Sequence, residues 1–167
     1  MAAHPAAPKA FASVQTPASF AQEAYNGVDA FVLVDAAGKR QPFRFRLEPV
    51  AGVAHLSKDE AGKQAPDFLG TELRARLAKA PVQFRLLAQL AKPGDPTADP
   101  TQPWPADREL VDLGTLTLTA PAADNAAAAS ELMLLPSNLV EGIEPSDDPL
   151  IDARVNAYAV SFSRRSQ

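Results

Sequence analysis

Apolar and polar residues alternate along three stretches of this chain, a pattern typical of β-strands that bury one face, and a fourth stretch is rich in the β-branched and aromatic residues that favour strands. The four predicted strands cover residues 28–35, 43–48, 82–90 and 110–119. A turn at Ala36–Lys39 separates the first two, which we therefore expect to form an antiparallel hairpin. Asn26–Gly27 is a turn signal and predicts a tight turn just before the first strand.

The charged positions of these strands indicate which faces meet solvent. In the second strand the apolar side chains alternate with Arg44 and Arg46, and Arg85 alternates in the same way in the third. We expect all three arginines on solvated faces. One face of each strand is then left to build a core.

Helices are predicted where apolar residues recur with helical spacing or where capping residues occur. The expected helices are an alanine-rich stretch at 3–12, a short helix opened by a Ser57–Glu60 capping box, a helix led by Pro66 and ended by Pro81, the alanine run 126–129, and a last helix from Pro149. Asp148 is its expected N-cap, because its carboxylate can accept hydrogen bonds from first-turn amides.

The order of these elements is hairpin, helix, strand, long proline-rich loop at 93–105, strand and helix. This order predicts an α+β fold that is mainly β. Four antiparallel strands supply only half of a closed barrel of about eight. A four-stranded sheet would leave an exposed edge and an uncovered apolar face, so residues 1–167 are interpreted as a single partial domain that needs a partner.

Two side chains of the last predicted helix are spaced to act together. Arg154 and Tyr158 are four residues apart and so share a face, to which Arg165 nearly returns. A guanidinium beside a phenol favours the phenolate, and a phenolate on a rigid helix is a suitable ligand for ferric iron. The alternative is that Tyr158 packs at the edge of a core while Arg154 pairs with a surface carboxylate.

Composition excludes several kinds of function. A net charge of −4 and a pI near 5.1 give no electrostatic reason to expect nucleic acid or an anionic membrane as a partner. No apolar run approaches the roughly 18 residues that span a bilayer. The start, Met1–Pro5, lacks the pattern of a secretory signal, and the compartment stays open. The absence of cysteine excludes disulfides, thiolate nucleophiles and thiolate metal sites.

The remaining polar motifs give little support for other chemistry. Neither His4 nor His55 has an Asp, a Ser or a second His at a spacing that is typical of a metal site or a catalytic triad. We therefore assign neither of them a metal, triad or acid–base role. Asp147–Asp148 is explained more simply as a helix cap than as a cation site. Glycine-rich phosphate-binding loops are absent.

The segments around the last helix form a recognisable series. It comprises Leu135-Pro136-Ser137-Asn138, then Gly142-Ile143-Glu144-Pro145-Ser146, then Arg154-x-x-x-Tyr158. Together these segments resemble the haem-binding end of the catalase superfamily. The chain is similar in particular to the small, catalase-related peroxidases of bacteria, on the segments Tyr25–Phe31, Trp104-Pro105, Leu113–Leu116 and Ala157–Arg165. The resemblance covers nearly all of the chain.

This resemblance implies a role for individual residues. Tyr158 would be the axial ligand of the iron of haem b, Arg154 would keep its oxygen ionised, and Arg165 would meet a haem propionate. Leu134 and Leu150 would be apolar neighbours of the porphyrin. An anionic oxygen ligand stabilises ferric iron and suits reactions with hydrogen peroxide or organic peroxides.

The chain also departs from the family pattern. The distal histidine and asparagine of the family belong to a first half with no counterpart here, so no catalytic residue is assigned. Family members form an eight-stranded barrel, and only its second four strands are expected in this chain. We therefore expect weak peroxidase activity or none from the chain alone.

Three interpretations remain open. The first is a haem peroxidase of the catalase-related type that is complete only with distal residues from elsewhere, such as a separately supplied first half. The second is a non-catalytic half-barrel that binds haem or self-associates. The third is a fragment without a stable fold of its own.

Overall fold

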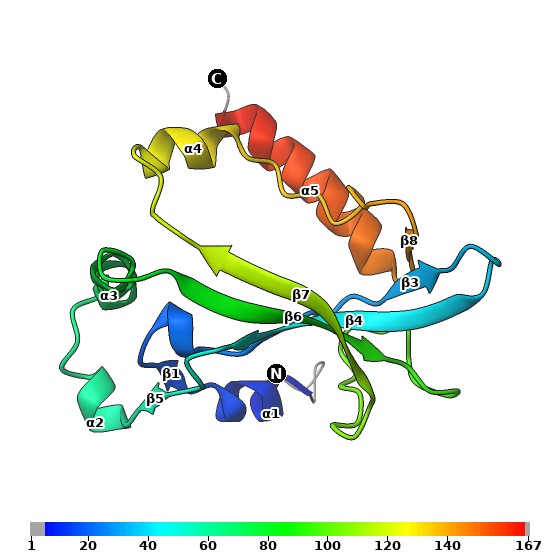
Figure 1. Cartoon of the computed structure of the whole chain (residues 1–167), viewed down its shortest axis with the longest axis horizontal. Helices are drawn as coiled ribbons and strands as arrows, with labels where there is room; N and C mark the ends of the chain where they lie inside the picture. Colours follow the sequence, from blue (N-terminus) through cyan, green and yellow to red (C-terminus); the bar gives the residue numbers. More distant parts are fainter. Residues whose placement is uncertain (1–5, 166–167) are drawn as a thin grey trace. The chain divides into compact units, whose positions relative to one another are not determined.

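The computed structural model describes residues 6–165 (Figure 1). Its strands are β1 (Thr16–Pro17), β2 (Tyr25–Asn26), β3 (Phe31–Val34), β4 (Arg40–Pro49), β5 (His55–Leu56), β6 (Val82–Leu90), β7 (Leu110–Leu118) and β8 (Ile143–Pro145). Its helices are α1 (Ala6–Ser13), α2 (Lys58–Ala61), α3 (Phe68–Leu77), α4 (Asn125–Glu131) and α5 (Pro149–Arg165), with a 3₁₀ turn at Phe20–Gln22. No helix within these residues is long and apolar enough to cross a membrane.

The predicted hairpin is present. β3 pairs antiparallel with β4, with Phe31 opposite Phe43 and Val34 opposite Arg40, and the connection contains Gly38 with φ of 79°. The larger sheet follows the order β7-β6-β4-β3-β8, with β2 also paired to β4. All four predicted strands are therefore confirmed, and the mixed α+β fold with them.

The prediction of four strands was nevertheless too low, because the described part of the sheet has six. The Gly142–Ser146 segment, where no strand was predicted, contains β8, which pairs antiparallel with β3 so that Val32 lies opposite Glu144. The described strand path runs from β7 to β8 without closing. The half-barrel therefore stays a prediction.

Asn26–Gly27 does not form the expected tight turn. Asn26 belongs to β2, and the Gly27 amide donates to the carbonyl of Phe45 at 2.8 Å. A Cβ at Gly27 would lie 3.0 Å from that oxygen. Glycine is needed here because two backbones approach closely, and the next strand starts only at Phe31, after Asp29.

The described residues fall into two compact units, which we describe separately. One contains the residues up to Tyr25, Leu47–Arg85 and Gly114–Ala120, and the other contains Asn26–Arg46, Leu86–Leu113 and the residues from Pro121 on. The first is called unit 1 and the second unit 2. The interpretation of the chain as one partial domain stays a prediction.

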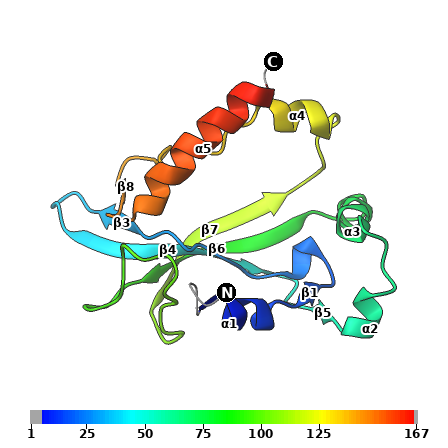
Figure 2. The same ribbon diagram turned by 180° about the vertical axis from the view of Figure 1, so that it is seen from behind.

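The core of unit 2 fixes where its last helix begins. Phe31, Phe43, Ala88 and Ile151 are buried together, and Phe45 packs against them with its ring 4.8 Å from that of Phe43. Ile151 lies in the first turn of α5, so burial of its side chain anchors that end of the helix. Both views show this end of α5 beside β3 and β8 (Figures 1 and 2).

Arg44 is buried, so the expectation that it lies on a solvated face was wrong. Its side chain is stacked 4.4 Å from the ring centre of Trp104, and only 5% of the residue is exposed. It donates to the carbonyls of Gln102 at 2.8 Å and Asp99 at 3.2 Å. The proline-rich loop thus covers this face of the sheet, and its carbonyls accept hydrogen bonds from both terminal nitrogens of the guanidinium.

Unit 1 is built around a second core. Ala21, Val82 and Phe84 are buried, with partly buried leucines packed against them, namely Leu47, Leu73, Leu77 and Leu118. The Ser57–Glu60 capping box is present, because the Ser57 hydroxyl accepts from the Glu60 amide and the Glu60 carboxylate accepts from the Ser57 amide. The next helix, α3, ends at Leu77, ahead of the predicted stop at Pro81.

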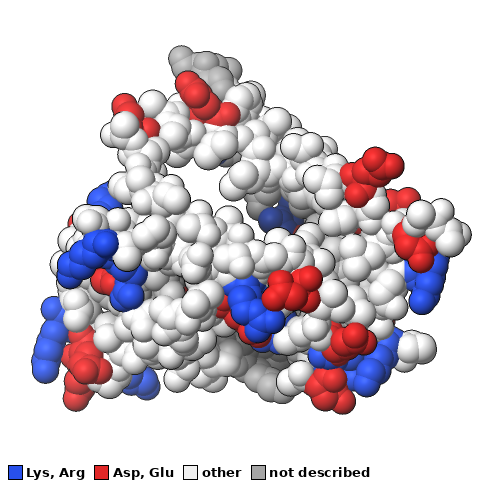
Figure 3. Space-filling view, viewed as in Figure 1, with Lys and Arg blue, Asp and Glu red and all other residues white. Residues whose placement is uncertain are grey.

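The predicted exposed edge of the sheet is also present. β7 pairs with β6 and has no second neighbour among the described strands. Several of its large apolar side chains are exposed, namely Leu110, Val111, Leu113 and Leu116. On the face shown in Figure 3, acidic and basic side chains are interspersed.

Candidate functional site

The candidate site lies in unit 2 on helix α5, whose start is set as its sequence predicts. The carboxylate of Asp148 accepts a hydrogen bond from the amide of Leu150 at 2.9 Å, and Pro149 occupies the first helical position. Asp148 is itself buried. The rotation of α5 is therefore fixed by a buried cap and a buried isoleucine, and this rotation decides which side chains share a face.

Arg154 and Tyr158 make the contact that their spacing predicts. Arg154 Nε donates to Tyr158 Oη at 3.1 Å, and the guanidinium carbon lies 5.5 Å from the centre of the phenol ring. This hydrogen bond raises the pKa of Arg154, although burial works against it. The guanidinium therefore stays charged beside the phenol oxygen.

Arg154 has a second anionic partner, which the sequence did not indicate. Its Nη1 forms an ion pair with a carboxylate oxygen of Asp29, a residue that is only 3% exposed. The alternative in which Arg154 pairs with a surface carboxylate was therefore wrong. Asp29 is 125 residues away in sequence, so no local spacing could have indicated the pair.

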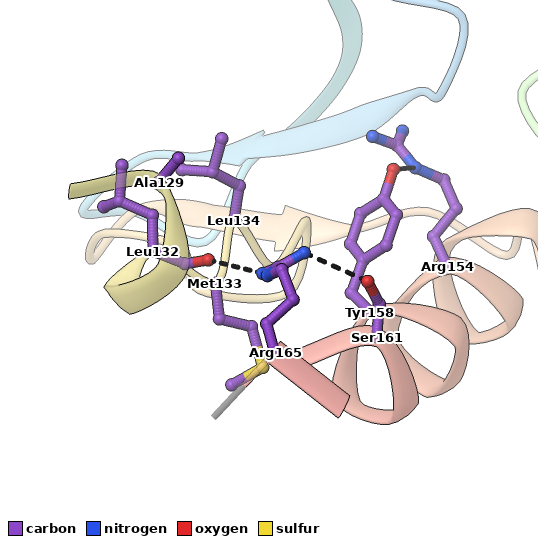
Figure 4. Close-up of a pocket in the computed structure, with 8 residues that line it drawn as sticks. All are labelled: Ala129, Leu132, Met133, Leu134, Arg154, Tyr158, Ser161 and Arg165. Atoms are coloured by element: carbon purple, nitrogen blue, oxygen red, sulfur yellow. Dashed lines mark hydrogen bonds between the residues drawn. The ribbon is translucent and has the colours of Figure 1, made fainter. Parts of the chain in front are cut away.

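A pocket of about 390 Å³ opens beside these residues (Figure 4). It is lined by Ala129, Leu132, Met133, Leu134, Arg154, Tyr158, Ser161 and Arg165. The apolar side chains come from α4 and the segment after it, and the polar ones come from α5. One wall is therefore hydrophobic, and the other presents a phenol and two guanidinium groups.

Arg165 connects the two walls of the pocket through hydrogen bonds. It donates to the hydroxyl of Ser161 at 3.0 Å and to the carbonyl of Leu132 at 2.9 Å. From both sides, α4 is seen beside the C-terminal end of α5 (Figures 1 and 2). The pocket lining thus has a cation held by neutral acceptors, and an incoming anionic group could take the place of these acceptors.

Four of the five residues predicted for the site meet in this pocket, and one does not. Arg154, Tyr158, Arg165 and Leu134 line it, with Leu134 77% exposed. Leu150 is half-buried in the first turn of α5 and is not among the lining residues. Leu150 shares this helix face with Arg154 and Tyr158, but it lies one turn before Arg154 and two turns before Tyr158, beyond the residues that line the pocket.

The sequence interpretation missed several lining residues. Ser161 lies three residues after Tyr158 and seven after Arg154, so helical spacing could have added it. Ala129, Leu132 and Met133 lie before the Pro-Ser-Asn segment, and their sequence carries no signal for a pocket.

Among the described residues, the histidine His55 is not part of the pocket lining. His55 belongs to β5 in unit 1, and its Nε2 lies 3.0 Å from a carboxylate oxygen of Glu23. His4 falls outside the described residues. Within the described residues no cluster of three or more His, Cys, Asp or Glu side chains could hold a metal ion.

Comparison with known proteins identifies the family. Residues 4–166 match the sequence profile of the family described as Catalase. The chain belongs to the catalase family.

Its sequence relatives include two bacterial proteins named catalase-related peroxidase. The one from Mycolicibacterium paratuberculosis is 37% identical over 150 residues, covering 90% of this chain and 48% of the relative. The one from Synechococcus elongatus is 35% identical over 156 residues, covering 93% of this chain and 46% of the relative. The chain thus spans about half the length of these relatives.

Solved catalase structures share the fold. A fungal catalase crystal structure superposes with a TM-score of 0.81 at 24% identity, covering 90% of this chain and 32% of that one. Catalase A from Saccharomyces cerevisiae superposes with a TM-score of 0.81 at 20% identity, covering 90% of this chain and 33% of that one. The described strands and helices therefore have the arrangement of part of a catalase.

Proposed function

We propose that this chain supplies the tyrosine side of a haem b site in an enzyme that consumes hydrogen peroxide or organic peroxides. The observation that carries the proposal is the hydrogen bond from Arg154 Nε to Tyr158 Oη at the wall of a pocket. A charged donor at the phenol oxygen favours the anionic form, which is the form that binds ferric iron. Membership in the catalase family supports the same assignment.

The residues present fit haem in three respects. Leucine and methionine side chains offer an apolar wall for a porphyrin, and Arg165 offers a cation for a propionate. Tyr158 offers an oxygen ligand suited to ferric iron. The volume of about 390 Å³ lies within the roughly 300–1,000 Å³ that is usual for ligand pockets.

Each residue then has a defined task. Tyr158 would hold the iron, Arg154 would keep the oxygen of Tyr158 charged, and Arg165 would orient the porphyrin through a propionate. Leu134 would cover the porphyrin edge, and Leu150 remains a predicted neighbour outside the present pocket. Bound haem would supply the ferric iron at which a peroxide is reduced.

Full activity under this proposal requires residues that the pocket lacks. Its lining contains no histidine and no carboxylate to move a proton between peroxide oxygens. The chain spans about half the length of its relatives, and we propose that residues outside 1–167 supply these groups. The exposed edge of β7 is a suitable place for further strands to pair and extend the predicted half-barrel.

A haemin titration of the isolated chain tests the proposal. We expect stoichiometric binding, with a ferric–tyrosinate charge-transfer band that disappears in Tyr158→Phe. Tyr25→Phe is the matched control, because Tyr25 is the only other tyrosine and lies in unit 1. An unchanged band in Tyr158→Phe would exclude Tyr158 as the ligand.

A non-catalytic haem-binding or self-associating module is the second candidate. The absence of acid–base side chains from the pocket lining favours it. The two candidates differ in peroxide turnover by the haemin-loaded chain. Stoichiometric haemin binding without turnover, even with a supplied first half of a relative, would support the module.

A further inference from the structure

Asp29 is a buried residue whose carboxylate contacts Arg154. It is 3% exposed, and one of its oxygens forms the ion pair with Arg154 Nη1. Its other oxygen, Oδ1, accepts no hydrogen bond from the described residues. An anion this deeply buried costs free energy unless a cation compensates it, so the pair with Arg154 is the main reason why Asp29 can occupy this position.

The backbone around Asp29 is held on both sides within unit 2. The Gly27 amide donates to Phe45 at 2.8 Å, and the carbonyl of Ala30 accepts from the amide of Ser146 at 3.4 Å. Ser146 lies just before the Asp148 cap of α5. Asp29 is thus held in a defined position relative to the start of the helix that carries Arg154.

Arg154 makes its two contacts through two nitrogens of the same planar guanidinium group. Nε faces Tyr158 and Nη1 faces Asp29. A guanidinium held at one nitrogen can still turn about its own bonds, whereas a guanidinium held at two nitrogens has one orientation. Arg154 needs this restraint, because its side chain is 36% exposed at an open pocket.

We propose that Asp29 is a positioning residue for the haem ligand: its carboxylate orients Arg154 so that Nε is directed at the oxygen of Tyr158. This inference rests on the proposed function of Tyr158. Asp29 acts through Arg154 and makes no contact with the pocket itself, since it is not among the residues that line it. Burial lowers the pKa of Arg44, and the charges of Asp148 and then Asp29 oppose this fall.

The first test needs no haem. With isotope-labelled arginine, nuclear magnetic resonance measures rotation about the Cζ–Nε bond of Arg154 in the full chain. Arg40 is the internal reference, because its ion pair with Glu144 spans 2.6 Å but about half of each side chain is exposed. We expect rotation of Arg154 to be at least tenfold slower than that of Arg40. Equally fast rotation would overturn the proposal.

The second test compares two substitutions in the haemin-loaded chain. Asp29→Asn keeps an oxygen that accepts from Nη1, whereas Asp29→Ala removes it. We expect the tyrosinate charge-transfer band at neutral pH to fall to half or less in Asp29→Ala and to be largely kept in Asp29→Asn. A wild-type band in Asp29→Ala, or an equal loss in both variants, would refute positioning.

Controls separate this inference from the proposed function. Glu144→Gln also removes a carboxylate from an arginine ion pair in unit 2, at an exposed site, and should leave the band unchanged. If the unmodified chain shows no tyrosinate band, the proposed function fails, while the rotation of Arg154 still tests the orientation by Asp29. If Asp29→Ala does not fold, the rotation measurement and the band of Asp29→Asn still support or refute positioning.

Discussion

Arg154 donates through Nε to the oxygen of Tyr158 at 3.1 Å and through Nη1 to buried Asp29, so one guanidinium links a carboxylate to a phenol. We expect Arg154→Met to abolish the tyrosinate band with haemin, and Arg154→Lys to restore little of it, because an ammonium lacks the planar fork. Removing the partner of a buried charge costs about 3–5 kcal/mol, and partial exposure of Arg154 reduces this to about 2 kcal/mol. Denaturant unfolding and a haemin titration measure the two effects.

The control for this prediction is Arg40→Met. Its pair with Glu144 is half exposed, so we expect a loss of under about 1 kcal/mol and an unchanged haemin spectrum. Equal losses in the two variants would contradict the importance assigned to Arg154.

Arg165 should recognise carboxylates on the ligand. We expect Arg165→Gln to weaken haemin binding by roughly tenfold, as a charged hydrogen bond is lost at a partly exposed site. Binding of haemin dimethyl ester, which has no free propionates, should not differ between the two chains. Arg164→Gln is the control, since Arg164 is exposed and does not line the pocket. An equal loss for both ligands would contradict the role given to Arg165.

The ion pair of Asp95 with Arg108 should make stability depend on pH in the acid range. Arg108 donates from Nε at 2.7 Å and Nη2 at 2.8 Å, and these bonds lower the pKa of Asp95 from 3.8 to about 2. A lowered pKa stabilises the fold above the ordinary value, and this stabilisation is lost as pH falls from about 4 to about 2. We expect the difference in unfolding free energy between wild type and Asp95→Asn to be constant above about pH 5 and to shrink below about pH 4.

The control is Asp107→Asn, which removes a single, largely exposed bond of 2.9 Å to the same arginine. Its effect on unfolding free energy should be small across this pH range. A difference for Asp95→Asn that does not change between about pH 2 and 5 would contradict the linkage.

Arg44 and Trp104 should hold the proline-rich loop on the sheet. Arg44→Met leaves the carbonyls of Gln102 and Asp99 without their donor, and we expect a loss of about 2–3 kcal/mol. Trp104→Phe removes the indole bond to the carbonyl of Pro96 at 2.8 Å and part of the buried ring on which Arg44 stacks, and it should cost about 2 kcal/mol. Arg74→Met, at an exposed position of α3, should change stability by less than about 0.5 kcal/mol. A similar small effect in Arg44→Met would indicate that the loop is held by other contacts.

Gly27 should not tolerate a side chain. A Cβ would lie 3.0 Å from the carbonyl oxygen of Phe45, and backbone atoms cannot move aside easily. We expect Gly27→Ala to cost about 1–3 kcal/mol in thermal or denaturant unfolding. Gly62→Ala is the control, because its nearest contact is 3.4 Å and its φ is −65°. A neutral Gly27→Ala would mean that β2 and β4 separate at little cost.

Local patterns in the sequence were sufficient for the hairpin, the long strands and the start of the last helix. Alternation predicted β4 and β6, because a two-residue period places apolar side chains on one face whatever they pack against. Asp148 and Pro149 predicted the start of α5, because a cap and a fixed φ act within one turn. The contact between Arg154 and Tyr158 followed from helical spacing alone.

Only the tertiary structure decided the positions that depend on distant segments. Arg44 alternates like a solvated residue, yet a loop more than fifty residues later covers it. No strand was predicted at Ile143–Pro145, which is short and contains a proline, yet pairing with β3 makes it a strand at the end of the sheet, where proline is tolerated. Asp29 and Arg154 are 125 residues apart in sequence and form an ion pair. The charge of Arg154 offsets the free-energy cost of burying the Asp29 carboxylate, and no local sequence pattern indicates this partner.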